Sequence, residues 1–368
     1  MRFTGDIKGK RIDMMKNNDK LSAILENNEI DAVIISDPYN LRYYSGFSGV
    51  EALFYVSASR QMLITDSRYT LWAERECGKG YVYTASDGGR GIIKEYLALD
   101  NVGCLGLEGA HLTYDRYSEL ASCFGIDNIV SVSDMLSGPR MVKEADEIEK
   151  IARAEAIGDE AFEYICNILR PGMTELEAAM ELEMYMRTHG AGGLSFDVIA
   201  ASGLNSASPH AVPSDRRLQK GDFLTMDFGC VYEGYCSDMT RTVVIGKASD
   251  RQRRLYNIVL EAQIAAIDGM KAGLTGAMVD GIARDIISAA GYGGCFGHGL
   301  GHSVGLFIHE EPRLSVREER ILEPGMVITV EPGIYVPGFG GVRIEDVVVV
   351  EEDGVRNLTH SPKELIEL

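Results

Sequence analysis

The sequence predicts two domains, an α/β domain over residues 1–136 and an α+β domain with an internal duplication over residues 137–368. Three observations lead to this prediction. The chain has 368 residues, more than one domain of about 150 residues would need. Its first third alternates short apolar runs with helical stretches, whereas the rest repeats the order helix pair, strand pair. Between them lies Ser137-Gly-Pro-Arg, a segment typical of a linker.

In the N-terminal domain, four apolar runs are expected to form strands. Runs of four to eight apolar residues bounded by turn residues are typical of buried strands. The expected strands cover residues 31–36, 52–57, 62–65 and 102–107, and a helix is expected over 67–76. This stretch of sequence contains no cluster of metal ligands or nucleophiles, so we expect the chemistry in the other domain.

The C-terminal domain begins with a long helical pattern over residues 143–169, which stops at Arg170-Pro-Gly. Thr174 and Glu177 have the spacing of a capping box and start a second helix that ends near Gly190. Two more helices are expected over 250–271 and 276–290, and strands over 222–228, 235–244, 327–335 and 342–350, the first two around a turn at 231–234. This repeated order predicts two related halves with a site at their junction.

Composition excludes several classes of protein. Hydrophobic residues make up 45% and charged residues 25% of the chain, which is the ordinary globular balance. The net charge of -19 argues against a nucleic-acid partner, because phosphate binding needs clustered basic residues. No apolar run is long enough to span a membrane, and residues 1–6 do not begin a signal peptide. Seven dispersed cysteines without a Cys-x-x-Cys pair favour a reducing cytoplasm. Cys230 and Cys236, which flank the expected turn, are expected to be small buried residues, with a disulfide or thiolate metal ligands as the alternative.

Five residues of the C-terminal domain predict a metal site: Asp227, Asp238, His302, Glu331 and Glu345. Four of them are carboxylates in or beside runs that have the pattern of buried strands, where an unpaired charge would cost several kcal/mol. Their summed charge of about minus four would be balanced by two divalent cations. Oxygen ligands with one imidazole suit Mn, and also Co or Zn.

The spacing of these carboxylates leaves alternatives open. Asp227 and Asp238 are eleven positions apart across the expected hairpin, so antiparallel pairing could place both on one face at a separation of ~5 Å. Alternatively, one caps a turn and the other is solvated. Arg343 shares a strand face with Glu345 and is expected to hold it, unless the two form a surface ion pair on an edge strand. The run Val347–Val350 favours a buried strand instead.

Histidines gather in the same domain. His298, His302 and His309 all lie in one glycine-rich stretch of twelve residues, 298–309. Glycines allow the backbone of such a stretch to approach a ligand closely. A lone histidine is usually structural, but this clustering predicts a functional role for all three. His210 lies in another expected loop, where the sequence by itself leaves a structural or a functional role open.

The motifs resemble those of one family. In order they are Ser-Pro-His-Ala around His210, Met-Asp-Phe-Gly, Ser-Asp-Met-Thr-Arg-Thr, Gly-His-Gly-Leu-Gly-His, Glu-Pro-Gly-Ile-Tyr and Val-Arg-Ile-Glu-Asp. They resemble the proline-specific metallopeptidases of the pita-bread fold, aminopeptidase P and prolidase. The segments Asp37-Pro-Tyr-Asn-Leu-Arg-Tyr-Tyr-Ser-Gly-Phe and Thr65-Asp-Ser-Arg-Tyr resemble the creatinase-type N-terminal domain of that family. The resemblance therefore implies a pita-bread catalytic domain with pseudo-twofold symmetry.

The resemblance also implies roles for individual residues. The five residues named above would bind the metals, with Asp238 and Glu345 shared by both ions. Glu331 would in addition move the proton of the attacking nucleophile, His309 and His210 would steady the intermediate or assist transfer to the proline nitrogen, and His298 and Tyr335 would line the substrate side. Arg313 could bind the terminal carboxylate of a short substrate, although it could equally be a surface arginine.

Several activities fit this resemblance. We expect an Xaa-Pro aminopeptidase, with an Xaa-Pro dipeptidase as the alternative and a non-catalytic binding protein of the same fold as a remote one. The complete ligand set argues against creatinase, which does not need the metals, and the large N-terminal domain argues against methionine aminopeptidase. The family analogy also implies a homodimer.

Overall fold

The computed structural model describes residues 17–368. The chain separates into two compact units, Met1–Arg140 and Met141–Leu368, so the division falls four residues after the predicted boundary at residue 136. The prediction that no signal peptide begins the chain concerns residues outside the described part. Among the described residues, no helix is both long and apolar enough to cross a membrane.

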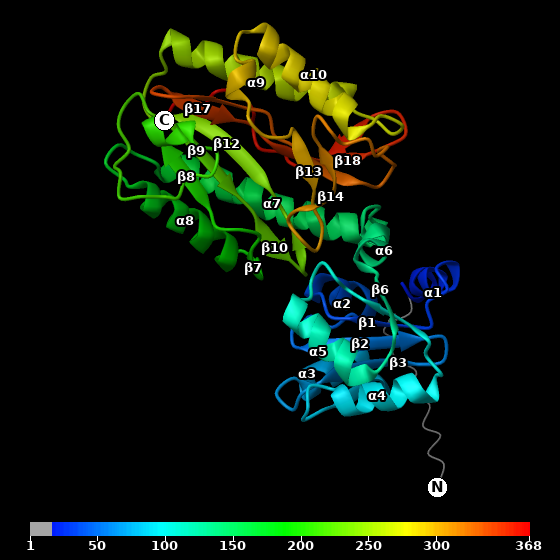
Figure 1. Cartoon of the computed structure of the whole chain (residues 1–368). Coiled ribbons are helices and arrows are strands. Elements are labelled where there is room, and N and C mark those ends of the chain that lie inside the picture. Colours follow the sequence, from blue (N-terminus) through cyan, green and yellow to red (C-terminus); the bar gives the residue numbers. More distant parts are fainter. Residues whose placement is uncertain (1–16) are drawn as a thin grey trace. The chain divides into compact units, whose positions relative to one another are not determined.

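The N-terminal unit is built on one six-stranded sheet with the order β4-β3-β2-β1-β5-β6 (Figure 1). All four predicted strands are present, as β1 (Ala32–Ile35), β2 (Ala52–Ser57), β3 (Gln61–Thr65) and β5 (Cys104–Leu107), and the predicted helix is α3 (Thr70–Cys77). The edge strands β4 (Val82–Thr84) and β6 (Asn128–Ser131) were not predicted, because they are short and their residues are partly or fully exposed. The remaining helices are α1 (Asn18–Asn27), α2 (Pro38–Ser45), α4 (Arg90–Leu99), α5 (Tyr114–Phe124) and α6 (Ser133–Ser137).

Four long helices of the C-terminal unit agree with the sequence patterns. They are α7 (Ala145–Ile168), α8 (Glu175–Thr188), α9 (Asp250–Gly269) and α10 (Gly276–Ala289). The predicted capping box of α8 is confirmed, since the Thr174 side chain accepts from the backbone of Glu177 and the Glu177 side chain accepts from the backbone of Thr174. These bonds satisfy backbone donors that the first helical turn leaves free.

The strands of this unit form two related sets, which lie between the helix pairs α7–α8 and α9–α10 (Figure 1). The first half contains β7 (Gly193–Leu194), β8 (Ile199–Ser202), β9 (Phe223–Phe228), β10 (Cys230–Tyr232), β11 (Tyr235–Cys236) and β12 (Met239–Val244). The second contains β13 (Gly301–Ser303), β14 (Glu310–Leu314), β15 (Val327–Val330), β16 (Gly333–Val336), β17 (Gly340–Arg343), β18 (Asp346–Val350) and β19 (Val355–Asn357). In each half a hairpin is split into two ladders: β9 pairs with β12 and β10 with β11, just as β15 pairs with β18 and β16 with β17.

This splitting corrects three predicted strands, each of which is broken in the middle. The strand expected over 235–244 breaks at Ser237-Asp238, that over 327–335 at Glu331-Pro332, and that over 342–350 at Ile344-Glu345. At every break the chain leaves one sheet and joins another. Asp238, Glu331 and Glu345 therefore lie at points where the backbone turns from one ladder into the next, which frees their side chains from the regular alternation of a strand.

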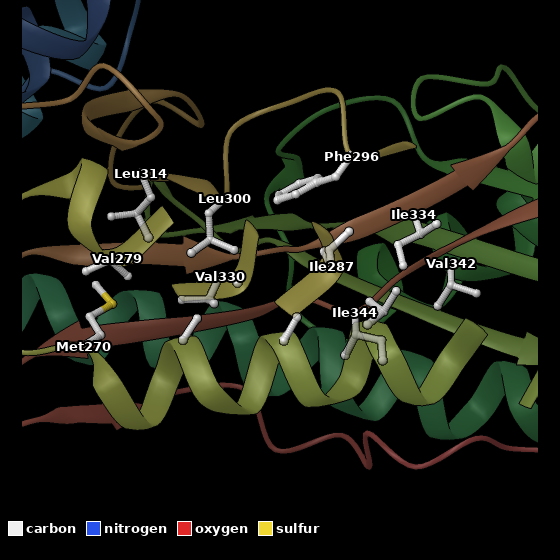
Figure 2. Close-up of a cluster of buried hydrophobic side chains, with 14 of the residues drawn as sticks. Met270, Val279, Ile287, Phe296, Leu300, Leu314, Val330, Ile334, Val342 and Ile344 are labelled. Atoms are coloured by element: carbon white, nitrogen blue, oxygen red, sulfur yellow. The ribbon is translucent and has the colours of Figure 1, made fainter. Parts of the chain in front are cut away.

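A hydrophobic cluster under α9 and α10 holds the second half together (Figure 2). Val279, Ala283 and Ile287 recur every fourth residue along α10 and are fully buried. They belong to the same cluster as Val330 and Ile344, the residues directly before Glu331 and Glu345. Burying such side chains contributes about 1.5–3 kcal/mol each. The core thus fixes the two strand breaks that carry these carboxylates. All seven cysteines are free thiols, and Cys230 and Cys236 are buried as predicted.

Candidate metal centre and active-site cavity

One cavity of about 470 Å³ in the C-terminal unit collects nearly all of the predicted site residues. Those that line it are Asp227, Asp238, His302, Glu331, Glu345, His210, His298, His309, Arg313 and Arg343. Tyr335 lies behind this lining and hydrogen-bonds to two of its members, His298 and Arg343. The structure therefore brings together side chains that are up to 135 positions apart in the sequence.

The centre of the cavity has the donor atoms of a metal site. Ligand atoms of Asp238, His302 and Glu345 all lie within 4.8 Å of one another, and the three residues are buried. His302 Nε2 lies 3.4 Å from Asp238 Oδ2 and 3.5 Å from Glu331 Oε1. Burial, together with the neighbouring carboxylates, raises the pKa of both Asp238 and Glu345, and burial raises that of Glu331 to about 8. A cation among these groups would offset the repulsion between the carboxylates and favour their ionised form.

Asp227 has one carboxylate oxygen without a partner. Its Oδ1 atom is buried and accepts no hydrogen bond from residues 17–368, while Oδ2 accepts one from Arg343 Nη2 at 2.5 Å. A buried acceptor without a donor is costly, and its position in this cavity suits a metal ligand. The predicted cross-strand pairing was wrong in register, because Asp227 pairs with Thr240 and Asp238 lies before β12 begins. Both residues nevertheless line the same cavity. The donor set therefore fits divalent metal ions.

His302 presents an unprotonated nitrogen to these carboxylates. Its Nδ1 atom lies 3.2 Å from the carbonyl oxygen of Ser303, which can only accept, so Nδ1 carries the proton of the neutral ring. Burial and the neighbouring His309 lower the pKa of His302 to about 3, so the ring is neutral at physiological pH. The Nε2 lone pair then points at Asp238 and Glu331, as a metal ligand requires.

The environment of Arg343 differs from the prediction. Arg343 does not hydrogen-bond to Glu345 directly; it binds Asp227, and its Nε atom donates to Thr240 Oγ1 at 2.9 Å. Thr240 in turn donates to Glu345 Oε2 at 2.6 Å, so the threonine hydroxyl connects the two. The alternative of a surface ion pair is also wrong, since Arg343 is 3% and Glu345 1% exposed. Arg343 thereby orients Asp227 directly and Glu345 through Thr240.

The substrate side of the cavity contains a second short network. Tyr335 OH accepts from Arg343 Nη1 at 2.8 Å and lies 3.0 Å from His298 Nε2. His298 Nδ1 lies 2.8 Å from the carbonyl oxygen of Gly299, so the tyrosine hydroxyl donates to Nε2 of a neutral ring. Burial, together with Arg343, lowers the pKa of His298 to about 4, in agreement with this arrangement.

His309 and His210 are exposed at the cavity mouth. The His309 ring lies 4.5 Å from that of His302, and burial lowers the pKa of His309. His210 follows Pro209, whose carbonyl accepts a hydrogen bond from Arg343 Nη1. Both imidazoles therefore face the space where a substrate would approach the acidic cluster.

Arg313 also reaches the cavity. It lies on β14 directly opposite His302, and its half-exposed side chain pairs only loosely with Glu311, at 3.6 Å. The role of Arg313 in substrate binding stays a prediction.

Some functional residues were not predicted. Phe196, Asp197 and Ile199 also line the cavity around the start of β8, a strand that was not predicted, and Pro209 lines it from the loop that follows β8. Glu155 on α7 was missed too, although it is fully buried and accepts a hydrogen bond from the backbone nitrogen of Asp238. The proximity of Pro209 to His210 is the one signal in the sequence that could have indicated this wall.

Comparisons with known proteins agree with this site. Residues 149–352 match the model of metallopeptidase family M24, and residues 18–142 match the Creatinase/Prolidase N-terminal domain. The chain belongs to metallopeptidase family M24. The predicted resemblance to proline-specific pita-bread metallopeptidases with a creatinase-type N-terminal domain is thereby confirmed, and so is the fold class. Membership of this family implies divalent metal ions at the candidate centre.

Individual M24 relatives match over nearly their whole length. The structure of an Xaa-Pro dipeptidase from Bacillus anthracis is 42% identical, with a TM-score of 0.93 and coverage of 97% of this chain and 100% of that one. An Xaa-Pro dipeptidase of Pyrococcus horikoshii is 40% identical over 355 residues, 95% of this chain and 99% of the relative. The structure of an X-Pro aminopeptidase from Thermotoga maritima is 40% identical, with a TM-score of 0.87 and coverage of 92% and 98%.

Proposed function

We propose that this M24 peptidase is an Xaa-Pro dipeptidase, which hydrolyses the bond before proline in free dipeptides. The sequence alone favoured an aminopeptidase, but the comparisons support the dipeptidase alternative better. Several relatives at 38–42% identity are named Xaa-Pro dipeptidase or prolidase, whereas one at 40% is named X-Pro aminopeptidase. The structural observation that carries the proposal is the position of Arg313. A guanidinium on the wall of the metal cavity, opposite His302, can bind the carboxylate that follows proline directly in a dipeptide.

Two divalent ions, with manganese as the first candidate, would be held by Asp227, Asp238, His302, Glu331 and Glu345. The free oxygen of Asp227 and the converging atoms of Asp238, His302 and Glu345 support this assignment. When bound, such ions polarise the scissile carbonyl and supply a nucleophilic water. As the family resemblance implies, Asp238 and Glu345 would contribute to the binding of both ions.

The side chains of the protein would handle protons and orientation. Glu331, which would be ionised as a metal ligand, can accept the proton of the nucleophile. His309 and His210 at the cavity mouth can donate hydrogen bonds to the developing oxyanion. They can also pass a proton to the proline nitrogen, which carries no hydrogen in the Xaa-Pro bond and must gain one when the bond is cleaved. His298 and Tyr335 form a fixed wall beside this space.

A matched rate comparison tests the proposal. Protein loaded with Mn²⁺ should cleave an Xaa-Pro dipeptide much faster than an Xaa-Pro-Xaa tripeptide, and a chelator should abolish both rates. Cleavage of the tripeptide at an equal or higher rate would make the protein an aminopeptidase. No cleavage of either peptide by metal-loaded protein would favour the binding protein of the same fold.

Arg313 provides a second test with a matched control. Arg313→Gln should raise KM for the dipeptide roughly tenfold or more, because a charged hydrogen bond is worth about 1.5–3 kcal/mol. It should leave KM for the dipeptide amide, which lacks the carboxylate, unchanged. Arg320 pairs with the same Glu311 at 2.8 Å but does not line the cavity, so Arg320→Gln should affect neither substrate.

Three further parts of the sequence analysis stay predictions. A homodimer is expected, and a monomer in light scattering at micromolar concentration would contradict it. The native metal requires elemental analysis of protein purified without added metal. Location in the cytoplasm can be checked by cell fractionation.

A further inference from the structure

The segment that carries His210 is anchored at both ends by a single buried carboxylate. This segment, which we call the His210 loop, covers residues 203–214 between β8 and the chain that leads to β9. Its middle reaches the cavity through Pro209 and His210, and His210 itself is exposed. An exposed side chain on a loop has no packing of its own to fix it, so its position depends on how the loop is held.

Glu175, the first residue of α8, holds the loop. It is 0% exposed, and its carboxylate accepts hydrogen bonds from five donor groups on three residues. Oε1 accepts from the backbone nitrogen and hydroxyl of Ser202 at 2.6 and 2.7 Å, directly before the loop. Oε2 accepts from the backbone nitrogen and hydroxyl of Ser214 at 3.1 and 2.6 Å, at its end. The Asn205 amide donates to both oxygens at 3.0 and 3.1 Å.

The charge of Glu175 belongs to this arrangement. A buried carboxylate is tolerated when several donors solvate it, and its place in the first turn of α8 adds the favourable end of the helix dipole. Arg216 donates to Ser202 Oγ and pairs with Asp222 at 2.6 Å, which places a guanidinium beside the same cluster. None of these groups lines the metal cavity, and so the cluster has no direct part in the chemistry.

Two other contacts secure the middle of the loop from the side of the metal centre. The backbone nitrogen of Gly341 donates to Ser206 Oγ at 2.9 Å, and Arg343 donates to the Pro209 carbonyl at 3.3 Å. The loop is thus held at its ends by α8 and at its middle by β17.

From this geometry we propose that Glu175 is a positioning residue, which acts through the His210 loop and fixes His210 against the bound peptide. The proposal rests on the proposed peptidase function for its kinetic consequence, but the anchoring of the loop can be tested without activity. A misplacement of about 1 Å can lower a rate by roughly 100-fold, so loss of the anchor should lower kcat by about 10- to 100-fold.

The first test is kinetic and uses a double-mutant cycle. In Glu175→Gln, one oxygen becomes an amide group that faces donors, so half of the anchor is lost while side-chain volume is kept. This variant and His210→Ala should each lower kcat for the Xaa-Pro dipeptide, and the double variant should be no slower than His210→Ala alone. Effects that multiply in the double variant would overturn the proposal, because Glu175 would then act by another route. Ser214→Ala, a milder change, serves if Glu175→Gln does not fold.

The matched control is Glu177, two residues further along the same helix. Glu177 accepts from the backbone of Thr174 in the capping box and makes no contact with the His210 loop. Glu177→Gln should lower the melting temperature without changing kcat, which separates a general weakening of α8 from loss of the anchor. An equal fall of kcat in Glu177→Gln would contradict the proposal.

The second test needs no substrate. Amide hydrogen exchange over residues 203–214 should become at least tenfold faster in Glu175→Gln than in the wild type, and should remain unchanged in Glu177→Gln. Unchanged exchange over this segment in Glu175→Gln would overturn the proposal whatever the kinetics show. A wild-type protein that cleaves no Xaa-Pro substrate would refute the proposed function alone, because the exchange comparison still decides the role of Glu175.

Discussion

Removal of the metals should leave a protein that is more stable at pH 6.5 than at pH 8. Burial raises the pKa of Glu331 from 4.5 to about 8, and raises that of Glu155 to about 8 as well. Between pH 4.5 and 8, such a carboxyl group is protonated in the folded state but ionised in the unfolded state. Its contribution to stability is therefore present at low pH and is lost as the pH rises toward 8.

The size of the effect follows from these values. Over the interval from pH 6.5 to 8, each such group should lower the free energy of unfolding by about 2 kcal/mol, since one pKa unit corresponds to ~1.4 kcal/mol. For a unit of the size of Met141–Leu368, this is a fall in melting temperature of roughly 4–8 °C for each group. The pKa values of Asp238 and Glu345 are raised too, which acts in the same direction.

Two buried histidines oppose the effect of the carboxyl groups below pH 6.5, which is why the comparison begins at that pH. Burial lowers the pKa of His302 to about 3 and that of His298 to about 4, so the unfolded state binds more protons than the folded state below pH 6.5. These groups make stability fall as the pH decreases from 6.5, which opposes the carboxyl groups. Below pH 6.5 the histidines therefore offset part of the gain from the carboxyl groups, whereas the change in stability between pH 6.5 and 8 is set mainly by the carboxyl groups.

Calorimetry of chelator-treated and Mn²⁺-loaded protein at the two pH values measures this difference. With metal bound, the ligands are ionised in the folded state, so the fall in melting temperature between pH 6.5 and 8 should shrink or reverse. Glu331→Gln removes one of these groups and should reduce the fall in the free energy of unfolding between pH 6.5 and 8 by about 2 kcal/mol. A metal-free wild type whose melting temperature is constant or rises over this interval would refute the argument, as would an unchanged slope in Glu331→Gln.

Three other predictions concern single residues. Asp238→Ala should abolish activity and lower the bound metal per chain while circular dichroism stays unchanged, and unchanged metal content would mean that the ligand assignment is wrong. Asp346→Asn should lower the free energy of unfolding by about 3–5 kcal/mol in urea denaturation, because it leaves the buried Arg241 guanidinium without its counter-charge; Glu183→Gln, in an exposed ion pair, should cost less than about 1 kcal/mol. Asp197 lines the cavity and makes no hydrogen bond among the described residues, so it is free to bind the α-amino group of a substrate. Asp197→Asn should therefore raise KM about tenfold for a dipeptide but not for its analogue without the α-amino group. Equal effects on both substrates would contradict this role.

The sequence was sufficient for the long helices and for the predicted ligands and histidines that line the cavity. The helices could be predicted because apolar residues recur at helical spacing and because caps such as Thr174 and Glu177 mark their starts. The metal-site residues could be found because carboxylates are rare in runs that otherwise have the pattern of buried strands. Both signals are local, and neither depends on which strand pairs with which.

What could not be predicted depends on contacts between distant segments. Continuous apolar patterns gave no sign of the breaks at Asp238, Glu331 and Glu345, because the break is produced by a change of partner strand. The partner of Arg343 was wrong for the same reason, since Asp227 reaches it from another sheet, 116 positions away. Glu175 looked like an ordinary first-turn acid of a helix, and only the fold brings Ser202 and Ser214 to it.

The duplication explains why the acidic ligands come in two pairs. In each half the outgoing strand carries one carboxylate close to where the hairpin splits, Asp227 near the end of β9 and Glu331 just after β15. The returning strand carries the other at its break, Asp238 before β12 and Glu345 before β18. The two similar halves thus each supply a similar carboxylate pair to the cavity. His302 breaks this similarity because it comes only from the second half, on β13, where its Nε2 atom lies 3.5 Å from Glu331. As the single imidazole of the proposed ligand set, His302 would give a neutral nitrogen ligand to one of the two proposed ions, so the two should differ in affinity and be lost in sequence as a chelator is added.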